Sequence, residues 1–299
     1  ADENTAVGYA ALNALTTGDL NTAIGHQAGL VFTTGFGNVF LGHNAGMATV
    51  DADKCTIIGY RAAAGGNMAA GAGDGTGADG TVAVGNQALY SLTSGSGNTA
   101  VGFEALDANA TSDFNTAVGH QALSAVNSSG DGRNTAVGWN AGLSITSGIS
   151  NVLIGAEAGD GFDAESDNIA IGFQAASGAI NGADKCIAIG TAALAGAATI
   201  DGTIAIGYQA LNALTSGASN VAVGYQAGIL QTSGNKNVVI GHQAFSSAAD
   251  GESSNICIGF QAGSDMVAGG CDHNVIIGDS AGTGGGAAMA SCVVIGKDA

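Results

Sequence analysis

The sequence predicts an all-β fold, a parallel β-solenoid of about 17 coils with a repeat of roughly 17–19 residues. One frame, an aliphatic residue followed by Gly, two variable residues and Ala, recurs from end to end of the chain. Most frame glycines keep one short spacing, as Gly8, Gly25 and Gly42 do, and the interval from Gly59 to Gly85 is the longest. A fixed short period is typical of solenoids, in which each repeat buries its apolar side against its neighbours. We therefore expect one domain over residues 1–299.

The three residues before each frame glycine form the predicted strand, as in Thr5-Ala6-Val7. They are aliphatic or β-branched in most coils, which favours a strand, and the glycine ends it. Because both faces of this strand are apolar, it needs cover on two sides, as strands of buried parallel sheets do. The coil interior covers one side, and partner chains are the natural cover for the other. The frame glycines are Gly8, Gly25, Gly42, Gly59, Gly85, Gly102, Gly119, Gly138, Gly155, Gly172, Gly190, Gly207, Gly224, Gly241, Gly259, Gly278 and Gly296.

The rest of each coil is expected to hold a second short strand and a turn. Residues 11–15 and 88–92 are examples of this second strand, and Thr-Thr-Gly or Thr-Ser-Gly then turns the chain. The long interval between Gly59 and Gly85 predicts an inserted loop at about residues 64–79, Ala64 to Asp79, that leaves the stack of strands intact.

Charge and composition exclude several function classes. The net charge is −18 with only six Lys and Arg, so clustered cations for nucleic acid or for an anionic membrane surface are lacking. No apolar run approaches the roughly 20 residues of a membrane-spanning helix, so no membrane insertion is expected. No nucleophile elbow, phosphate-binding loop or zinc motif emerges, and the strand columns hold no carboxylates that could face each other across a groove. We therefore expect no enzymatic activity.

The motif Asn-Thr-Ala-Ile-Gly-His-Gln-Ala-Gly, residues 21–29, resembles the head domains of trimeric autotransporter adhesins. It is equally similar to repeat regions of phage tail fibres and related surface-fibre proteins. The resemblance covers essentially the whole chain, although the period is longer than the adhesin repeat. It implies a left-handed β-roll, a homotrimer, an attachment function and a place outside the cell, on a cell surface or a virion.

The fourth residue before the frame glycine is Asn in twelve coils, and we predict a structural ladder of stacked Asn side chains. Three coils have Cys there, Cys55, Cys186 and Cys292, too far apart to form disulfides within one stack. Cys257 belongs to a strand, and Cys271 is the cysteine expected to be exposed. The ladder comprises Asn4, Asn21, Asn38, Asn98, Asn115, Asn134, Asn151, Asn168, Asn220, Asn237, Asn255 and Asn274.

The first residue after the frame glycine, here called the ring column, carries an aromatic or His ring in twelve coils. The second residue, here called the amide column, is Gln in eight coils. A ladder of rings packing on one another is one interpretation. A platform for sugar rings is another, with Trp139, Phe173, Tyr208 and Tyr225 as the candidate binding residues. A metal site at His26 and His43 is a third.

Acidic residues gather in the longer loops, where solvated charge is one interpretation and a weak calcium site the other. No stretch has the spacing of an EF-hand or of a calcium-binding nonapeptide repeat, so no cofactor is assigned. The residues concerned are Asp74, Asp79, Asp160, Asp163, Glu165, Asp167, Asp250 and Glu252.

The function expected is therefore structural and adhesive: a repeat segment of an extracellular surface fibre or tail fibre that attaches to a cell-surface glycan or protein. An alternative is a filament subunit that stacks end to end, since open strand edges can pair with another copy. A further alternative is a solenoid that binds ice or glycans. Threonine, which an ice-binding face would need, fills the first strand position in only six of the seventeen coils.

Overall fold

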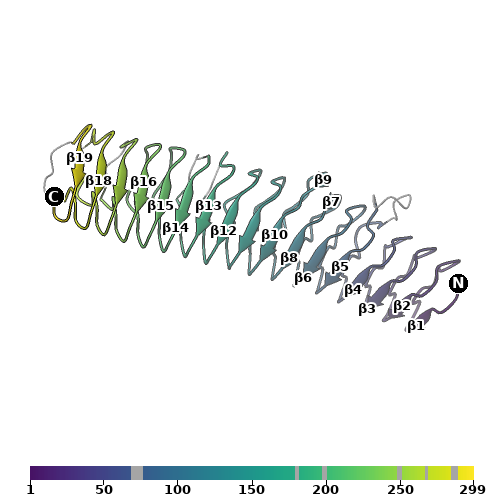
Figure 1. Cartoon of the computed structure of the whole chain (residues 1–299). Coiled ribbons are helices and arrows are strands. Elements are labelled where there is room, and N and C mark those ends of the chain that lie inside the picture. Colours follow the sequence, from purple (N-terminus) through teal and green to yellow (C-terminus); the bar gives the residue numbers. More distant parts are fainter. Residues whose placement is uncertain (69–76, 179–181, 197–200, 248–250, 267–268, 284–288) are drawn as a thin grey trace. The chain divides into compact units, whose positions relative to one another are not determined.

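The structure is a computed structural model that describes residues 1–68, 77–178, 182–196, 201–247, 251–266, 269–283 and 289–299. In these residues all regular secondary structure is β-strand (Figure 1). The chain divides into two compact units, an N-terminal unit of residues 1–150 and a C-terminal unit of residues 151–299.

Each coil contributes one three-residue strand that ends immediately before its frame glycine. The N-terminal unit holds β1 (Thr5–Val7), β2 (Thr22–Ile24), β3 (Val39–Leu41), β4 (Thr56–Ile58), β5 (Val82–Val84), β6 (Thr99–Val101), β8 (Thr116–Val118) and β10 (Thr135–Val137), with a small extra pair, β7 (Ser112–Asp113) and β9 (Gly130–Asp131). The C-terminal unit holds β11 (Val152–Ile154), β12 (Ile169–Ile171), β13 (Ile187–Ile189), β14 (Ile204–Ile206), β15 (Val221–Val223), β16 (Val238–Ile240), β17 (Ile256–Ile258), β18 (Val275–Ile277) and β19 (Val293–Ile295).

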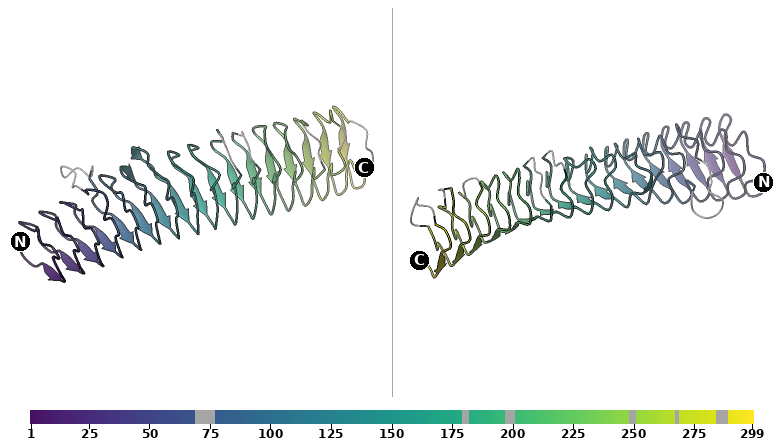
Figure 2. Two further views of the ribbon diagram at one scale, coloured as in Figure 1. Left: turned by 180° about the vertical axis from the view of Figure 1, so that it is seen from behind. Right: turned by 90° about the horizontal axis from the view of Figure 1, so that it is seen from above.

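Within each unit, successive strands pair in parallel and in register, one coil above the next (Figure 2). Thr5 pairs with Thr22, for example, and Ile187 pairs with Ile204. Equivalent positions of successive coils therefore lie in straight columns along each unit. The predicted parallel β-solenoid is confirmed, with the repeat that the frame glycines indicate.

The interior of each coil is filled by small and branched apolar side chains. The middle residue of every frame strand except the terminal β1 and β19 is buried, and the Ala three residues after the frame glycine is buried in nearly all coils. Larger side chains such as Phe32, Leu92 and Ile145 fill the far end of their coils. The first and third strand residues point away from this core and are partly exposed.

The prediction of a second strand in each coil, with residues 11–15 and 88–92 as examples, is wrong. These residues form turns, in which the second and fourth residues after the frame glycine have positive φ, as at Gln87 (57°) and Leu89 (51°). Their amides still bond to the adjacent coils, because Gln87 N donates to Tyr60 O and Leu89 N donates to Ala105 O. Backbone hydrogen bonds between coils are thus satisfied without an extended strand.

The insertion between β4 and β5 leaves the stack intact, as predicted, because Thr56 pairs directly with Val82. Both ends of the expected loop carry buried side chains. Ala64, Met68 and Ala78 are buried within the coil, and Val50 N donates to Met68 O. The centre of the predicted loop, residues 69–76, lies outside the described residues.

Candidate functional site

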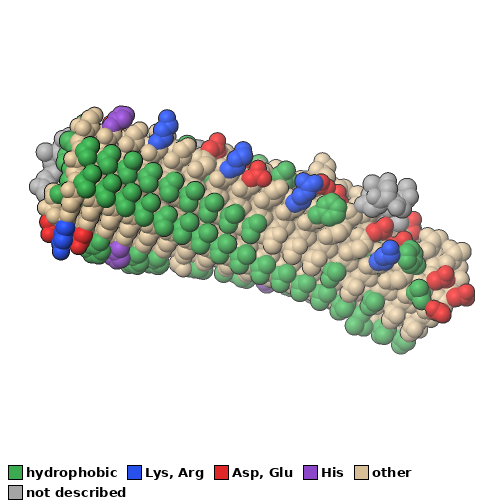
Figure 3. Space-filling model, viewed as in Figure 1, with side chains coloured by type: hydrophobic (Ala, Val, Ile, Leu, Met, Phe, Trp, Pro, Cys, Tyr) green, Lys and Arg blue, Asp and Glu red, His purple; other side chains and the backbone are tan. Residues whose placement is uncertain are grey.

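The outward face of the strands is apolar and has no cover. The third strand residue is aliphatic in every coil, and Ile154 and Ile240 remain about two-fifths exposed. Figure 3 shows hydrophobic side chains in rows over the strands. We call this surface, formed by the first and third residues of each strand, the strand face.

The strand face differs between the two units. In the C-terminal unit both outward columns are aliphatic in all nine strands, as in Ile204 and Ile206 of β14. In the N-terminal unit the first residue is Thr in six of the eight frame strands, so hydroxyl groups line most of one of the two outward columns. All six threonines that the sequence places in this column therefore belong to the N-terminal unit.

The rings of the ring column stack on one another in three places where neighbouring coils both have one. Tyr208, Tyr225, His242 and Phe260 form one such stack, with centroid separations of 5.2, 4.9 and 5.3 Å. The second stack comprises Tyr9, His26, His43 and Tyr60, and a shorter one Phe103 and His120. The aromatic rings are roughly half exposed, but inside a stack each ring covers the faces of its neighbours and presents only its edge.

This geometry limits what the ring column can bind. A sugar that packs on an aromatic face needs that face to be open, which holds for Phe173 because its column neighbours are Ala156 and Thr191. The His26 and His43 rings are nearly parallel, at 7° and 4.8 Å between centroids. Their in-plane lone pairs therefore run side by side and do not converge on one metal ion, which needs Zn–N distances of about 2.0–2.1 Å. Trp139 is half-exposed in the same column.

The amide column forms its own ladder in the C-terminal unit. Gln226 Nε2 donates to Gln209 Oε1 at 3.0 Å, and Gln243 and Gln261 continue the series in the same direction. Where the preceding coil has Glu, the Gln donates to a carboxylate, as Gln174 Nε2 does to Glu157 Oε2 at 2.7 Å. Each of these amide groups is therefore oriented by the coil before it.

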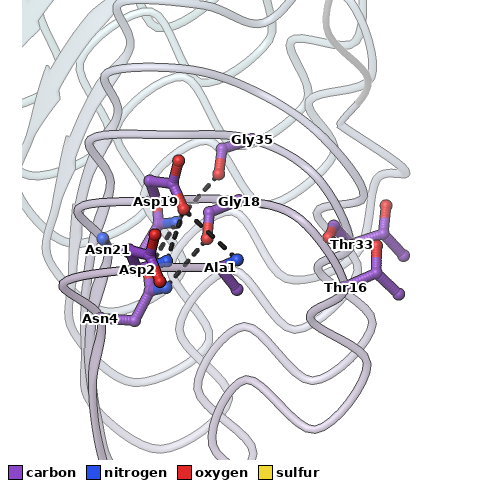
Figure 4. Close-up of polar contacts among 9 residues, drawn as sticks. All are labelled: Ala1, Asp2, Asn4, Thr16, Gly18, Asp19, Asn21, Thr33 and Gly35. Atoms are coloured by element: carbon purple, nitrogen blue, oxygen red, sulfur yellow. Dashed lines mark hydrogen bonds and ion pairs between the residues drawn. The ribbon is translucent and has the colours of Figure 1, made fainter.

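In each unit the ladder Asn residues lie in a column behind the strands, and of the twelve all but Asn4 are buried. Asn21 is typical: its amide and its Nδ2 both donate to Asn4 Oδ1, and its Nδ2 also donates to Gly35 O (Figure 4). Where two successive coils of one unit both carry Asn, as with Asn21 and Asn38, the column joins them through side chain and backbone together. Most of its polar groups are used within the protein, whereas Asn168 Nδ2 is buried with no hydrogen-bond partner among the described residues.

Two Cys residues of this column, Cys55 and Cys186, are each followed in the next coil by Thr. Cys55 N donates to Asn38 Oδ1, and its Sγ donates to Ala78 O at 3.2 Å. Thr81, which takes the column position in the next coil, has a buried hydroxyl with no hydrogen-bond partner in the described residues. The hydroxyl of Thr203, which follows Cys186, is buried and unpaired in the same way. The Asn ladder therefore has fewer hydrogen bonds between coils at these two places.

Two of the cysteines are buried too deeply to ionise at neutral pH. Burial raises the pKa of the Cys55 and Cys257 thiols to about 12, so neither is a thiolate at neutral pH. The expectation that Cys271 is exposed is wrong: it is buried, and Met289 N donates to its Sγ. None of the five cysteines forms a disulfide within the described residues.

A second polar ladder was missed by the sequence analysis. The sixth residue before the frame glycine is often Asp, and its carboxylate accepts the backbone amide of the preceding coil, as Asp53 does from Phe36 and Asp113 from Ser96. The next residue along the chain has positive φ in every coil, and Lys54 and Lys236 are examples. Aligning the repeats would have revealed the Asp column, but not its backbone partner.

The interpretation of the acidic loops as solvated charge is wrong for two residues. Glu165 and Glu252 are buried, and the Glu165 carboxylate accepts the amides of Asp163 and Gly182. Asp79 accepts the Asp53 amide. Asp74 and Asp250 lie outside the described residues, and within the described ones no three His, Cys, Asp or Glu side chains gather where they could hold a metal ion.

Two acidic pairs occupy equivalent places in their coils, Glu104 with Asp107 and Glu157 with Asp160. Partial burial raises the pKa of Asp107 and of Asp160, and the neighbouring glutamate in each pair raises it further. The charged form of each aspartate is thus disfavoured by folding.

We expect the double variant Asp107→Asn/Asp160→Asn to be more stable than the wild type at pH 7. In the folded state each pKa lies above its unfolded value of about 3.9, so the folded protein binds more protons and its free energy of unfolding falls as pH rises through that interval. Asn has no charge to bury, so the gain should shrink as the pH falls toward about 3.9 and below. Urea unfolding of both proteins across this pH range measures it. A gain that does not depend on pH would contradict the stated cause.

Among the described residues, no helix is long or apolar enough to cross a membrane. Comparisons with protein-family models, with curated proteins and with solved structures found no match to this chain.

Proposed function

We propose that this chain is a non-catalytic structural and adhesive protein, a repeat segment of an extracellular surface fibre or tail fibre. Its strand face would be covered by further copies of the chain, in a homotrimer, and its exposed columns would serve attachment. The observation that carries the proposal is the uncovered strand face, on which aliphatic side chains recur once per coil.

The size of the strand face supports an interface. In the C-terminal unit nine strands at about 4.8 Å spacing, each three to four residues wide, give an area of roughly 400–600 Å². This reaches the size of the largest apolar patch on soluble monomers, about 300–600 Å², and such patches often mark interaction sites. The N-terminal unit has a strand face of its own, of similar width, in which Thr occupies most of one column.

A second copy fits this face better than an unrelated partner does. The face repeats once per coil, so an identical chain presents the same spacing and the same aliphatic columns. Its strand positions carry no charge, so the net charge of −18 per chain resides elsewhere. The apolar contact then has to offset only repulsion between more distant charges, which salt screens. The number of three copies rests on the resemblance to adhesin heads and tail fibres.

We expect Val223→Lys, in the third position of β15, to disrupt the oligomer without unfolding the coil, because Lys can reach solvent in a single chain but not between two apolar faces. Sedimentation of the wild type should give a trimer, and of the variant a smaller species. Ser219→Lys in the same coil is the matched control, because Ser219 is exposed and other coils carry Lys54, Lys185 and Lys236 at that position.

Two results would contradict the proposal. The first is a wild-type chain that sediments as a monomer at all concentrations. The second is a Val223→Lys variant that keeps the wild-type assembly.

A further inference from the structure

We infer that the coil containing Thr191 and Ala192 is a binding site for an N-acetylated hexosamine ring. The inference deepens the proposed attachment function by naming a ligand class. It rests on that function for its biological role, and its geometry comes from the ring and amide columns of the C-terminal unit.

This coil interrupts both columns at once. In the ring column Thr191 stands between Phe173 and Tyr208, and in the amide column Ala192 stands between Gln174 and Gln209. The register is continuous here, since Ile171 pairs with Ile189 and Ile189 with Ile206, so the interruption comes from small side chains and not from a shifted coil.

The missing ring leaves a gap of defined size. Stacked rings in adjacent coils of the C-terminal unit are 4.9–5.3 Å apart, so Phe173 and Tyr208, two coils apart, are separated by about 10 Å. Both rings are accessible, with 50% of Phe173 and 43% of Tyr208 exposed. A six-membered ring placed over Thr191 would lie about 5 Å from each, the spacing that the column already uses.

The missing amide leaves a donor and an acceptor facing each other. Gln209 Oε1 is engaged by Gln226, so the Nε2 of Gln209 lies on the side of Ala192. Gln174 Nε2 is engaged by Glu157, so the Oε1 of Gln174 lies on the side of Ala192 as well. Neither of these two atoms has a hydrogen-bond partner within the described residues. An amide between them would accept from Gln209 and donate to Gln174, as each Gln of the ladder does.

The ligand that completes the coil is therefore a ring with an amide attached beside it. An N-acetylhexosamine has this form, with an acetamido group on a pyranose ring. The faces of Phe173 and Tyr208 that border the gap are both electron-rich, and a pyranose presents polarised C–H bonds to each.

The chain contains an internal comparison. Asn86 interrupts the ring column between Tyr60 and Phe103 in the N-terminal unit, but the amide column keeps Gln87 in the same coil. Asn86 also places a polar side chain where the ring would lie. This coil should therefore not bind the same ligand.

The test uses the whole chain and two sugar probes, N-acetylglucosamine and its β-1,4-linked trimer, with glucosamine as the deacetylated control. Saturation-transfer NMR and titration should show that the wild type binds both acetylated probes. A probe that reaches the sites of several copies at once should bind more tightly than one that reaches a single site. The variant Thr191→Tyr/Ala192→Gln completes both columns and should lose at least roughly tenfold in affinity while melting no earlier than the wild type. Asn86→Tyr should leave binding unchanged.

Three outcomes would overturn the inference: no binding of either acetylated probe at millimolar concentration, undiminished binding by the filled variant, or equal binding of glucosamine. None of them bears on the oligomer, which sedimentation tests separately. A monomeric wild type that binds the probes would remove the trimer and keep the sugar site.

Discussion

Gly207→Ala is expected to unfold the coils around β14. Gly207 has a φ of +133°, a region that side chains rarely adopt, and a Cβ there would overlap the carbonyl oxygen of Gly224 in the next coil. Neither backbone can move away, since Gly207 N donates to Ile189 O and Gly224 N donates to Ile206 O. We expect a loss of more than about 3 kcal/mol, measured by urea unfolding followed by circular dichroism.

Gly202 provides the control in the same coil. It also has positive φ, +60°, but nothing lies within 4 Å of its added Cβ, and the equivalent position holds Lys185 and Lys236 in other coils. Gly202→Ala should cost only about 1–2 kcal/mol, the penalty of the left-handed conformation itself. Equal losses for the two variants would show that contact between coils is not what selects the frame glycine.

Asn115→Ala is expected to cause the second large loss of stability. The buried Asn115 side chain accepts the amide and the Nδ2 of Asn134 and donates to Asn98 Oδ1 and Ser112 Oγ. Removing it leaves buried donors and acceptors unpaired, each at a cost of about 1–3 kcal/mol, and opens a cavity. We expect a total of roughly 3–5 kcal/mol in urea unfolding.

The two places where Cys and Thr interrupt the Asn ladder suggest a compensating double variant. Because Thr follows Cys at the two interrupted places, Asn115→Cys/Asn134→Thr should be more stable than the sum of its single variants predicts. Cys can donate to a backbone carbonyl, as Cys55 does. Thr has no side-chain amide, so it lacks the Nδ2 group of Asn134 that would otherwise stay unpaired. A double-mutant cycle measures this coupling, and strict additivity would contradict the explanation.

The sequence determined the repeat, the strand positions and the columns. A short fixed period with an aliphatic-Gly frame permits little other than stacked parallel strands, and register follows because every coil repeats the same frame. The polar columns were equally visible as residue types: Asn4 to Asn274 in one column, and rings from Tyr9 onward in another.

Tertiary structure decided what those columns do. Residues 11–15 look like a strand by composition, but left-handed φ at Leu12 makes them turns, which alternation of apolar residues does not reveal. Cys271 and Glu165 were expected at the surface because they lie in loops, and the adjacent coils bury both. Much of the ring column became stacks with covered faces, because coil spacing brings rings of adjacent coils within about 5 Å of each other. Which side chains recur at a position is a property of the sequence, whereas their exposure depends on the neighbouring coil, which only the folded chain supplies.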